Sequence, residues 1–219
     1  MKRLYNLSDV HLYCLTTIPR EGRTYLDMVE AACRGGADAI QLREKAIPTR
    51  ELVRVAKDLK AVCDEYGALF LVNDRADVAY AADADGVHLG QEDLPVRTAR
   101  EILGHDKIIG VSCHSTAQAL IAQEEGADYV SCGPLFATPT KPTYKPVTLD
   151  LIAQNRKVVR LPFVAIGGVD EDRVEQVIRA GADRVAVVRA VCGSDDPESA
   201  ARRIKNKILT AKAESASAA

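Results

Sequence analysis

The sequence lacks any long apolar run and any strong charge imbalance. No stretch of about 18 apolar residues could form a transmembrane helix, and no basic segment followed by an apolar one resembles a secretory signal. The net charge of −2 provides no positive field that would attract nucleic acid or an anionic membrane. We therefore expect a cytoplasmic protein with neither nucleic acid nor membrane as a partner.

The cysteines lack the spacing of a zinc or redox motif. There are six, with no C-x-x-C pair and no nearby histidine pair of zinc-finger spacing. We expect them to be reduced thiols in the core: Cys14, Cys33, Cys63, Cys113, Cys132 and Cys192.

The length of 219 residues, with 47% hydrophobic and 27% charged residues, fits one globular domain. Short β-branched runs alternate with helical patterns, as in repeated βα units. The predicted strands are residues 10–16, 39–43, 69–73, 87–89, 108–112, 129–133, 163–166 and 185–188. Their number favours an α/β fold with a single (βα)8 TIM barrel over residues 1–210, followed by a flexible tail over residues 211–219.

An open, doubly wound sheet would show the same alternation of strands and helices. Such a fold commonly carries G-x-G-x-x-G after its first strand, and this sequence does not. The barrel is therefore the preferred interpretation, and its active site should lie at the carboxyl ends of the strands.

Polar residues end the second predicted strand. Strict alternation would point Gln41, Arg43 and Lys45 to the same side, where they would suit an anion such as pyrophosphate. A solvated strand end with a salt bridge at the rim is the alternative.

Two aspartates follow the third and fourth strands. Asp74 and Asp93 should lie on adjacent loops, and Mg²⁺ is often held by one or two carboxylates together with substrate oxygens. Each aspartate also precedes a helical segment, so helix capping is the alternative.

The loops after the last three strands offer phosphate ligands. A proline-stiffened loop after the sixth strand carries Thr138, Thr140 and Lys141. Gly168 follows the seventh strand and Arg189 the eighth, where such barrels commonly bind phosphate through backbone N–H groups.

Taken in order, these segments resemble the thiamine-phosphate synthase family. The matching motifs are Q-L-R-E-K, V-N-D-R, G-V-H-L-G-Q-E-D, I-G-V-S, G-P-L-F-A-T-P-T-K, A-I-G-G and V-A-V-V, and they span nearly the whole chain. The resemblance implies a transferase that joins a pyrimidine pyrophosphate to a thiazole phosphate with Mg²⁺ as cofactor.

The resemblance also implies residue roles. The pyrimidine pyrophosphate would contact Gln41, Arg43, Glu44, Lys45, Asn73, Ser112 and Lys141, of which Arg43, Lys45, Ser112 and Lys141 would support the chemical step. The thiazole phosphate would contact Thr138, Pro139, Thr140, Gly168, Val188 and Arg189, and the metal would bind Asp74 and Asp93. Arg189 departs from the pattern, because the family commonly has serine there.

The implied reaction loses pyrophosphate to give a pyrimidine-stabilised cation, which the thiazole nitrogen captures. It needs no protein nucleophile or strong base, in agreement with the lack of a Ser/His/Asp or Cys/His arrangement. His88 is accordingly interpreted as a positioning or packing residue, and Tyr129 as core packing. A thiazole tautomerase and a non-catalytic phosphate-ligand sensor are the alternative functions, and the sequence leaves open whether the chain forms a homo-oligomer.

Overall fold

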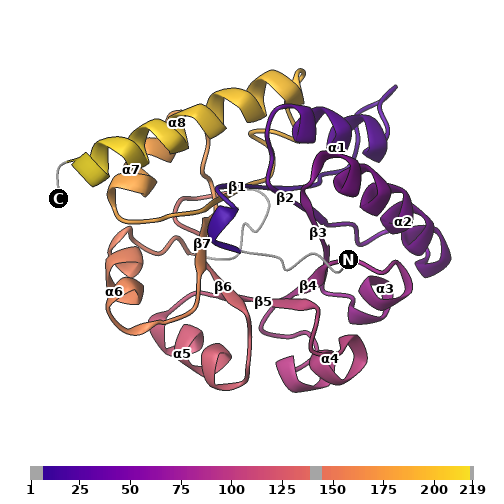
Figure 1. The fold of residues 1–219 in the computed structure, drawn as a ribbon, viewed down its shortest axis with the longest axis horizontal. Helices are drawn as coiled ribbons and strands as arrows, with labels where there is room; N and C mark the ends of the chain where they lie inside the picture. The colour runs from indigo at the N-terminus through magenta and orange to yellow at the C-terminus, as the bar shows by residue number, and fades with distance from the viewer. Residues whose placement is uncertain (1–6, 139–144, 218–219) are drawn as a thin grey trace.

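The computed structural model describes residues 7–138 and 145–217, in which eight parallel strands close into a barrel (Figure 1). Each strand pairs with the next along the chain, and the last pairs with the first. The strands are β1 (Leu12–Leu15), β2 (Ala39–Leu42), β3 (Leu69–Asn73), β4 (Gly86–Leu89), β5 (Ile108–Cys113), β6 (Tyr129–Cys132), β7 (Phe163–Ile166) and β8 (Val185–Val187). The predicted (βα)8 barrel is confirmed, and each strand end differs from its prediction by at most two residues.

The helices form a ring outside the barrel (Figure 1). They are α1 (Tyr25–Arg34), α2 (Thr49–Tyr66), α3 (Ala76–Ala81), α4 (Val96–Leu103), α5 (Thr116–Glu124), α6 (Asp150–Val158), α7 (Val174–Arg179) and α8 (Pro197–Ser217), with a 3₁₀ turn η1 (Leu7–Asp9) before β1. In α2, the buried residues Leu52, Ala56, Leu59 and Cys63 recur at three- and four-residue spacing. This spacing directs one helix face onto the sheet.

The strands are mostly apolar because both of their faces are covered. In β3, Phe70 and Val72 pack in the cluster beneath the helices, whereas Leu69 and Leu71 belong to the separate cluster inside the barrel. Gln41 of β2 is among the few buried polar residues of the described chain, and only 2% of its surface is exposed. A polar group at such a position requires a partner.

Aspartates at the amino-terminal ends of the strands tie neighbouring strands together. Asp38 Oδ2 accepts hydrogen bonds from the N–H groups of His11 and Leu12 at 2.8 Å. Asp128 Oδ2 likewise accepts from the Ile109 N–H at 2.7 Å. These aspartates end the Gly-Ala-Asp segments at residues 36–38 and 126–128 of the sequence. The two segments therefore stabilise the barrel floor and leave the opposite end for the site.

The end of α8 differs from the prediction of a flexible tail from Ala211. The helix continues to Ser217. Ala211 is only 2% exposed, and the Lys212 ammonium lies 3.1 Å from His11 Nδ1. These contacts attach the last turns of α8 to the barrel floor, which composition alone could not indicate.

All six cysteines are free and buried, as predicted. None of the helices in residues 7–138 and 145–217 combines the length and apolar character that crossing a membrane would demand.

Candidate active site

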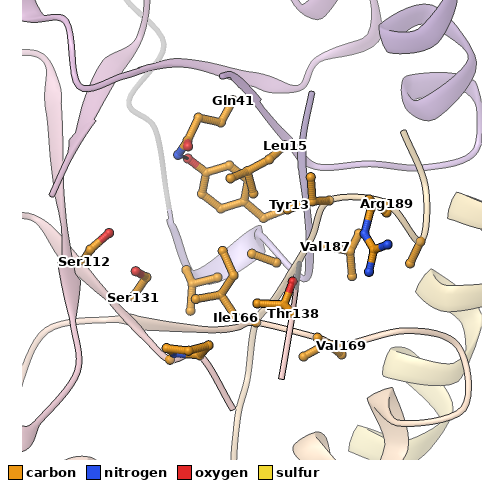
Figure 2. A pocket seen from close by; sticks show the side chains of 18 of the residues that line it. Tyr13, Leu15, Gln41, Ser112, Ser131, Thr138, Ile166, Val169, Val187 and Arg189 are labelled. Atoms are coloured by element: carbon orange, nitrogen blue, oxygen red, sulfur yellow. Dashed lines mark hydrogen bonds between the residues drawn. The ribbon is translucent and has the colours of Figure 1, made fainter. Parts of the chain in front are cut away.

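A cavity of about 340 Å³ opens at the carboxyl ends of the strands. Predicted site residues come to its wall from six of the eight strands or the loops that follow them: Gln41, Arg43, Asn73, Ser112, Thr138, Gly168, Val188 and Arg189. Figure 2 shows Ser112 and Ser131 on the side of the cavity away from Arg189. The cavity can therefore hold two polar groups at opposite ends.

Gln41 presents an unpaired acceptor to this cavity. Its Nε2 donates a hydrogen bond to the Tyr13 hydroxyl at 2.8 Å (Figure 2). Its Oε1 is buried and has no hydrogen-bond partner among the residues that the structure describes. A buried carbonyl oxygen without a partner is costly, so this atom is suited to accept a hydrogen bond from a ligand.

A chain of hydrogen bonds continues from Tyr13 across the barrel interior. The hydroxyls of Tyr13 and Tyr129 lie 3.0 Å apart, and the Tyr129 hydroxyl lies 2.7 Å from His88 Nδ1. His88 Nε2 lies 3.0 Å from Ser112 Oγ and 3.4 Å from Ser131 Oγ. Tyr13, His88 and Ser131 line the cavity.

The sequence interpretation missed most of this chain. Tyr13 and Ser131 were not singled out, and Tyr129 was interpreted only as packing. The available signal was a tyrosine at an inward-facing strand position, because a buried phenol usually finds a hydrogen-bond partner. The positioning interpretation of His88 agrees with its contacts.

The predicted convergence of Gln41, Arg43 and Lys45 is correct for the first two only. Arg43 lines the cavity, but β2 ends at Leu42, so strand alternation does not extend to Lys45. The Lys45 ammonium instead forms an ion pair of 2.9 Å with Asp74.

Glu44 also lies outside the cavity wall. It accepts hydrogen bonds from the Tyr25 hydroxyl and from the Ala46 N–H. Burial opposes its ionisation, but these hydrogen bonds and those from the Lys45 and Ile47 N–H groups lower the pKa of Glu44 overall. Glu44 therefore braces the loop that carries Lys45.

Asp74 and Asp93 interact with each other. Burial and the neighbouring Asp74 carboxyl raise the pKa of Asp93, against the opposing effects of the Gly90 N–H and Lys45. Gly90 N–H donates to Asp93 Oδ2 at 2.6 Å. Two carboxylates this close repel each other, and a divalent cation would remove the repulsion.

The structure does not support the helix-capping alternative for these aspartates. The N-cap residues are Arg75 for α3 and Pro95 for α4, and neither makes a side-chain capping bond. No group of three or more His, Cys, Asp or Glu side chains suited to a metal occurs within the described ranges. A pair of carboxylates matches Mg²⁺, which normally takes its other ligands from water and substrate.

The opposite end of the cavity is formed by the loops after β7 and β8. Gly167 and Gly168 adopt φ angles of 101° and 66°, and a Cβ on Gly168 would approach Phe136 Cβ to 2.7 Å. The Arg173 guanidinium donates to the Gly168 carbonyl at 2.8 Å and lies over the Phe136 ring. These contacts fix the glycine backbone against the β6 loop.

Arg189 lies at the cavity mouth, as predicted. It is exposed, and within residues 7–138 and 145–217 its side chain makes no hydrogen bond or ion pair. The backbone around it forms a helical turn, in which Cys192 N–H donates to the Val188 carbonyl at 3.0 Å. Arg20 and Arg23 of the β1–α1 loop donate to the carbonyls of Gly193 and Ser194 at 2.6 and 2.9 Å, which holds the turn from the other side.

Thr138 is half-buried in the cavity wall. Pro139, Thr140 and Lys141, which the sequence predicts at the same site, lie outside the described residues.

Comparisons with known proteins agree with the fold. A family model described as thiamine monophosphate synthase matches residues 12–191. A thiamine-phosphate synthase of Methanoculleus marisnigri is 50% identical over 207 residues, which cover 94% of this chain and 98% of that protein. One of Thermosynechococcus vestitus is 46% identical over 94% of this chain, which spans only 58% of that longer relative.

A solved structure is similar to the whole barrel. The thiamine phosphate pyrophosphorylase from Pyrococcus furiosus superposes with a TM-score of 0.87 at 39% identity, covering 94% of this chain and 99% of that one.

Proposed function

The chain belongs to the thiamine monophosphate synthase family, and we propose that it joins 4-amino-2-methyl-5-(diphosphooxymethyl)pyrimidine to 4-methyl-5-(2-phosphooxyethyl)thiazole. The products are thiamine phosphate and pyrophosphate. It is an enzyme of the transferase class in thiamine biosynthesis. The tautomerase and sensor alternatives are not favoured, because the similar proteins carry synthase names.

The observation that carries this proposal is a single cavity with polar groups at two opposite ends. At one end, Gln41 offers a buried acceptor and Arg43 a charged donor. These groups suit an aminopyrimidine that carries a diphosphate, because the amino group can donate to Gln41 Oε1 and the guanidinium can pair with phosphate oxygens. Asn73 and Ser112 add neutral donors to the cavity wall.

The other end suits the phosphate of the thiazole. Backbone N–H groups of Gly168 and Val188 and the guanidinium of Arg189 are the proposed donors, with Thr138 beside them. The glycine backbone is already held by Arg173. A rigid set of donors binds phosphate with little loss of conformational freedom.

Asp74 and Asp93 are the proposed ligands of Mg²⁺, because their carboxylates interact and only two of them are present. When bound, the metal would supply positive charge that stabilises the departing pyrophosphate. The Lys45 ammonium already lies 2.9 Å from Asp74, so it would also be near the departing pyrophosphate. Glu44 is proposed to act by holding that loop.

The protein residues are proposed to work by orientation and by stabilising charge. Arg43, Lys45, Ser112 and Lys141 would bind the pyrophosphate as its bond to the pyrimidine methylene breaks. The thiazole nitrogen then bonds to the methylene carbon, so no side chain has to act as a nucleophile. The six free thiols are consistent with a reducing compartment such as the cytoplasm.

One assay tests the proposal. The purified chain is mixed with both phosphorylated heterocycles and Mg²⁺, and thiamine phosphate and pyrophosphate are measured. Equal amounts of the two products are expected. Isomerisation of a thiazole without condensation would indicate the tautomerase, and ligand binding without any turnover would indicate the sensor.

A further inference from the structure

We infer that Tyr129 is a positioning residue that fixes the tautomer of His88 and thereby aims the hydroxyl hydrogen of Ser112 into the cavity. This role deepens the proposed function, on which its effect on turnover rests. The tautomer itself can be measured without any substrate.

The inference starts from the hydrogen bond between Gln41 and Tyr13. The amide Nε2 is the donor, so the Tyr13 oxygen accepts and its own hydrogen must be directed elsewhere. The Tyr129 oxygen lies 3.0 Å from the Tyr13 oxygen and can accept this hydrogen. Tyr13 is only 4% exposed, so bulk solvent competes little for this hydrogen.

The same reasoning fixes the direction of the next hydrogen bond, between Tyr129 and His88. Because the Tyr129 oxygen accepts from Tyr13, its hydrogen points to His88 Nδ1 at 2.7 Å. His88 Nδ1 therefore carries no proton, and a neutral imidazole then carries its proton on Nε2. If the bonds ran the other way, the Tyr13 oxygen would accept two hydrogens, and the Tyr13 hydrogen would have no acceptor among residues 7–138 and 145–217.

Burial favours phenols over phenolates at both tyrosines. It raises the pKa of Tyr13 and Tyr129 well above the ordinary value for tyrosine. Both rings therefore keep the hydrogens that the directional chain requires.

The Tyr129 ring lies where a side chain on Gly110 would otherwise be. Gly110 of β5 is the register partner of Tyr129 on β6, and a Cβ at Gly110 would lie 2.1 Å from Tyr129 Cζ. The absence of that Cβ lets the ring lie across β5 and bring its hydroxyl to His88 of β4. Glycine at position 110 is therefore required for the contact between Tyr129 and His88.

The tautomer of His88 determines the direction of the Ser112 hydroxyl hydrogen. His88 Nε2–H donates to Ser112 Oγ at 3.0 Å, so the serine hydrogen is free to turn to the cavity that Ser112 lines. Gln41 Oε1 is an acceptor at the other end of this series of hydrogen bonds. The series therefore presents one donor, the Ser112 hydroxyl, and one acceptor, Gln41 Oε1, to a bound ligand.

Nitrogen NMR of protein that contains ¹⁵N-labelled histidine tests the tautomer of His88 directly. The wild type should show His88 protonated at Nε2 and unprotonated at Nδ1, and the signal is assigned by its disappearance in His88→Gln. In Tyr129→Phe, which removes only the hydroxyl, the fixed tautomer should give way to a mixture. Tyr13→Phe should also weaken the preference for this tautomer, because Tyr129 then no longer accepts the hydrogen bond that directs its own hydrogen to His88.

Turnover provides the second readout. The kcat of Tyr129→Phe should fall at least about tenfold with a smaller change in KM, because a wrong tautomer removes a donor in the site. Tyr66→Phe is the matched control, since that hydroxyl is on the outer surface with one 3.4 Å contact to Glu30, and it should retain full activity.

Two results would overturn the inference: an Nδ1-protonated His88 in the wild type, or an unchanged tautomer in a folded Tyr129→Phe. An unfolded Tyr129→Phe would leave the wild-type spectrum and Tyr13→Phe as the decisive measurements. Failure of the wild type to make thiamine phosphate would contradict the proposed function without altering the tautomer result.

Discussion

The Lys45 ammonium lies 2.9 Å from the Asp74 carboxylate and joins the loops that follow β2 and β3. The Lys45 side chain is 62% exposed, so solvent weakens the pair, which should contribute no more than about 1 kcal/mol. One ammonium faces two interacting carboxylates, Asp74 and Asp93. The group is therefore one positive charge short of neutrality.

This shortage predicts that Mg²⁺ binds weakly alone and more tightly with pyrophosphate, because two carboxylates leave most of its ligand positions open. Calorimetry with and without pyrophosphate measures the difference. Asp93→Asn should abolish the enhancement, whereas Asp58→Asn on the outer face of α2 should preserve it. Tight metal binding in the absence of the anion would contradict this prediction.

Lys141→Ala should lower kcat more than it raises the KM for the thiazole phosphate. A loop cation beside departing pyrophosphate acts mainly in the transition state. Lys157→Ala, in the last turn of α6, is the control. A raised KM with an unchanged kcat would assign Lys141 to ground-state binding instead.

Arg189→Ser should weaken thiazole phosphate binding by about tenfold or more and leave pyrimidine pyrophosphate binding nearly unchanged. A charge-assisted contact is worth about 1.5–3 kcal/mol more than none, and the exposed side chain lies at the cavity mouth. Titration of each ligand measures both affinities. Arg179→Ser, whose exposed ion pairs lie at the far end of α7, should match the wild type. Equal thiazole phosphate affinities in the wild type and Arg189→Ser would leave the backbone donors and Thr138 to hold the phosphate.

Gly110→Ala should destabilise the fold by about 1–3 kcal/mol or more, because its Cβ would overlap the Tyr129 ring. Urea unfolding measures the change in free energy. In a Tyr129→Leu background the added methyl should cost clearly less, since the ring is gone. The same cost in both backgrounds would show that the strain arises from the backbone of β5 rather than from the ring.

His11 should make stability depend on pH at the barrel floor. Burial lowers its pKa, Lys212 and Lys205 lower it further, and Asp38 and Asp183 oppose them. The unfolded chain then binds more protons than the folded one below the ordinary pKa of histidine, so stability should fall as pH drops from about 7 toward 5.

Unfolding temperatures across that range measure the effect. His11→Gln should flatten the dependence relative to the wild type, whereas His105→Gln, on the exposed loop after α4, should leave it unchanged. An equally steep curve in His11→Gln would assign the dependence to other groups.

The sequence by itself determined the barrel and one wall of its cavity. Strands buried on both faces must be apolar almost throughout, so eight such runs were visible without coordinates. Gln41, Asn73 and Ser112 were found because polar residues at the carboxyl ends of parallel strands meet at one mouth.

Only the tertiary structure decided which polar groups pair with one another. Tyr13 and Tyr129 are 116 residues apart in sequence, and their hydroxyls meet only because β1 and β6 face each other across the closed barrel. Lys45 turns to Asp74 because strand geometry ends at Leu42. Sequence periodicity gives the direction of a side chain from its own strand, but a contact also depends on the curvature that brings another strand to face it.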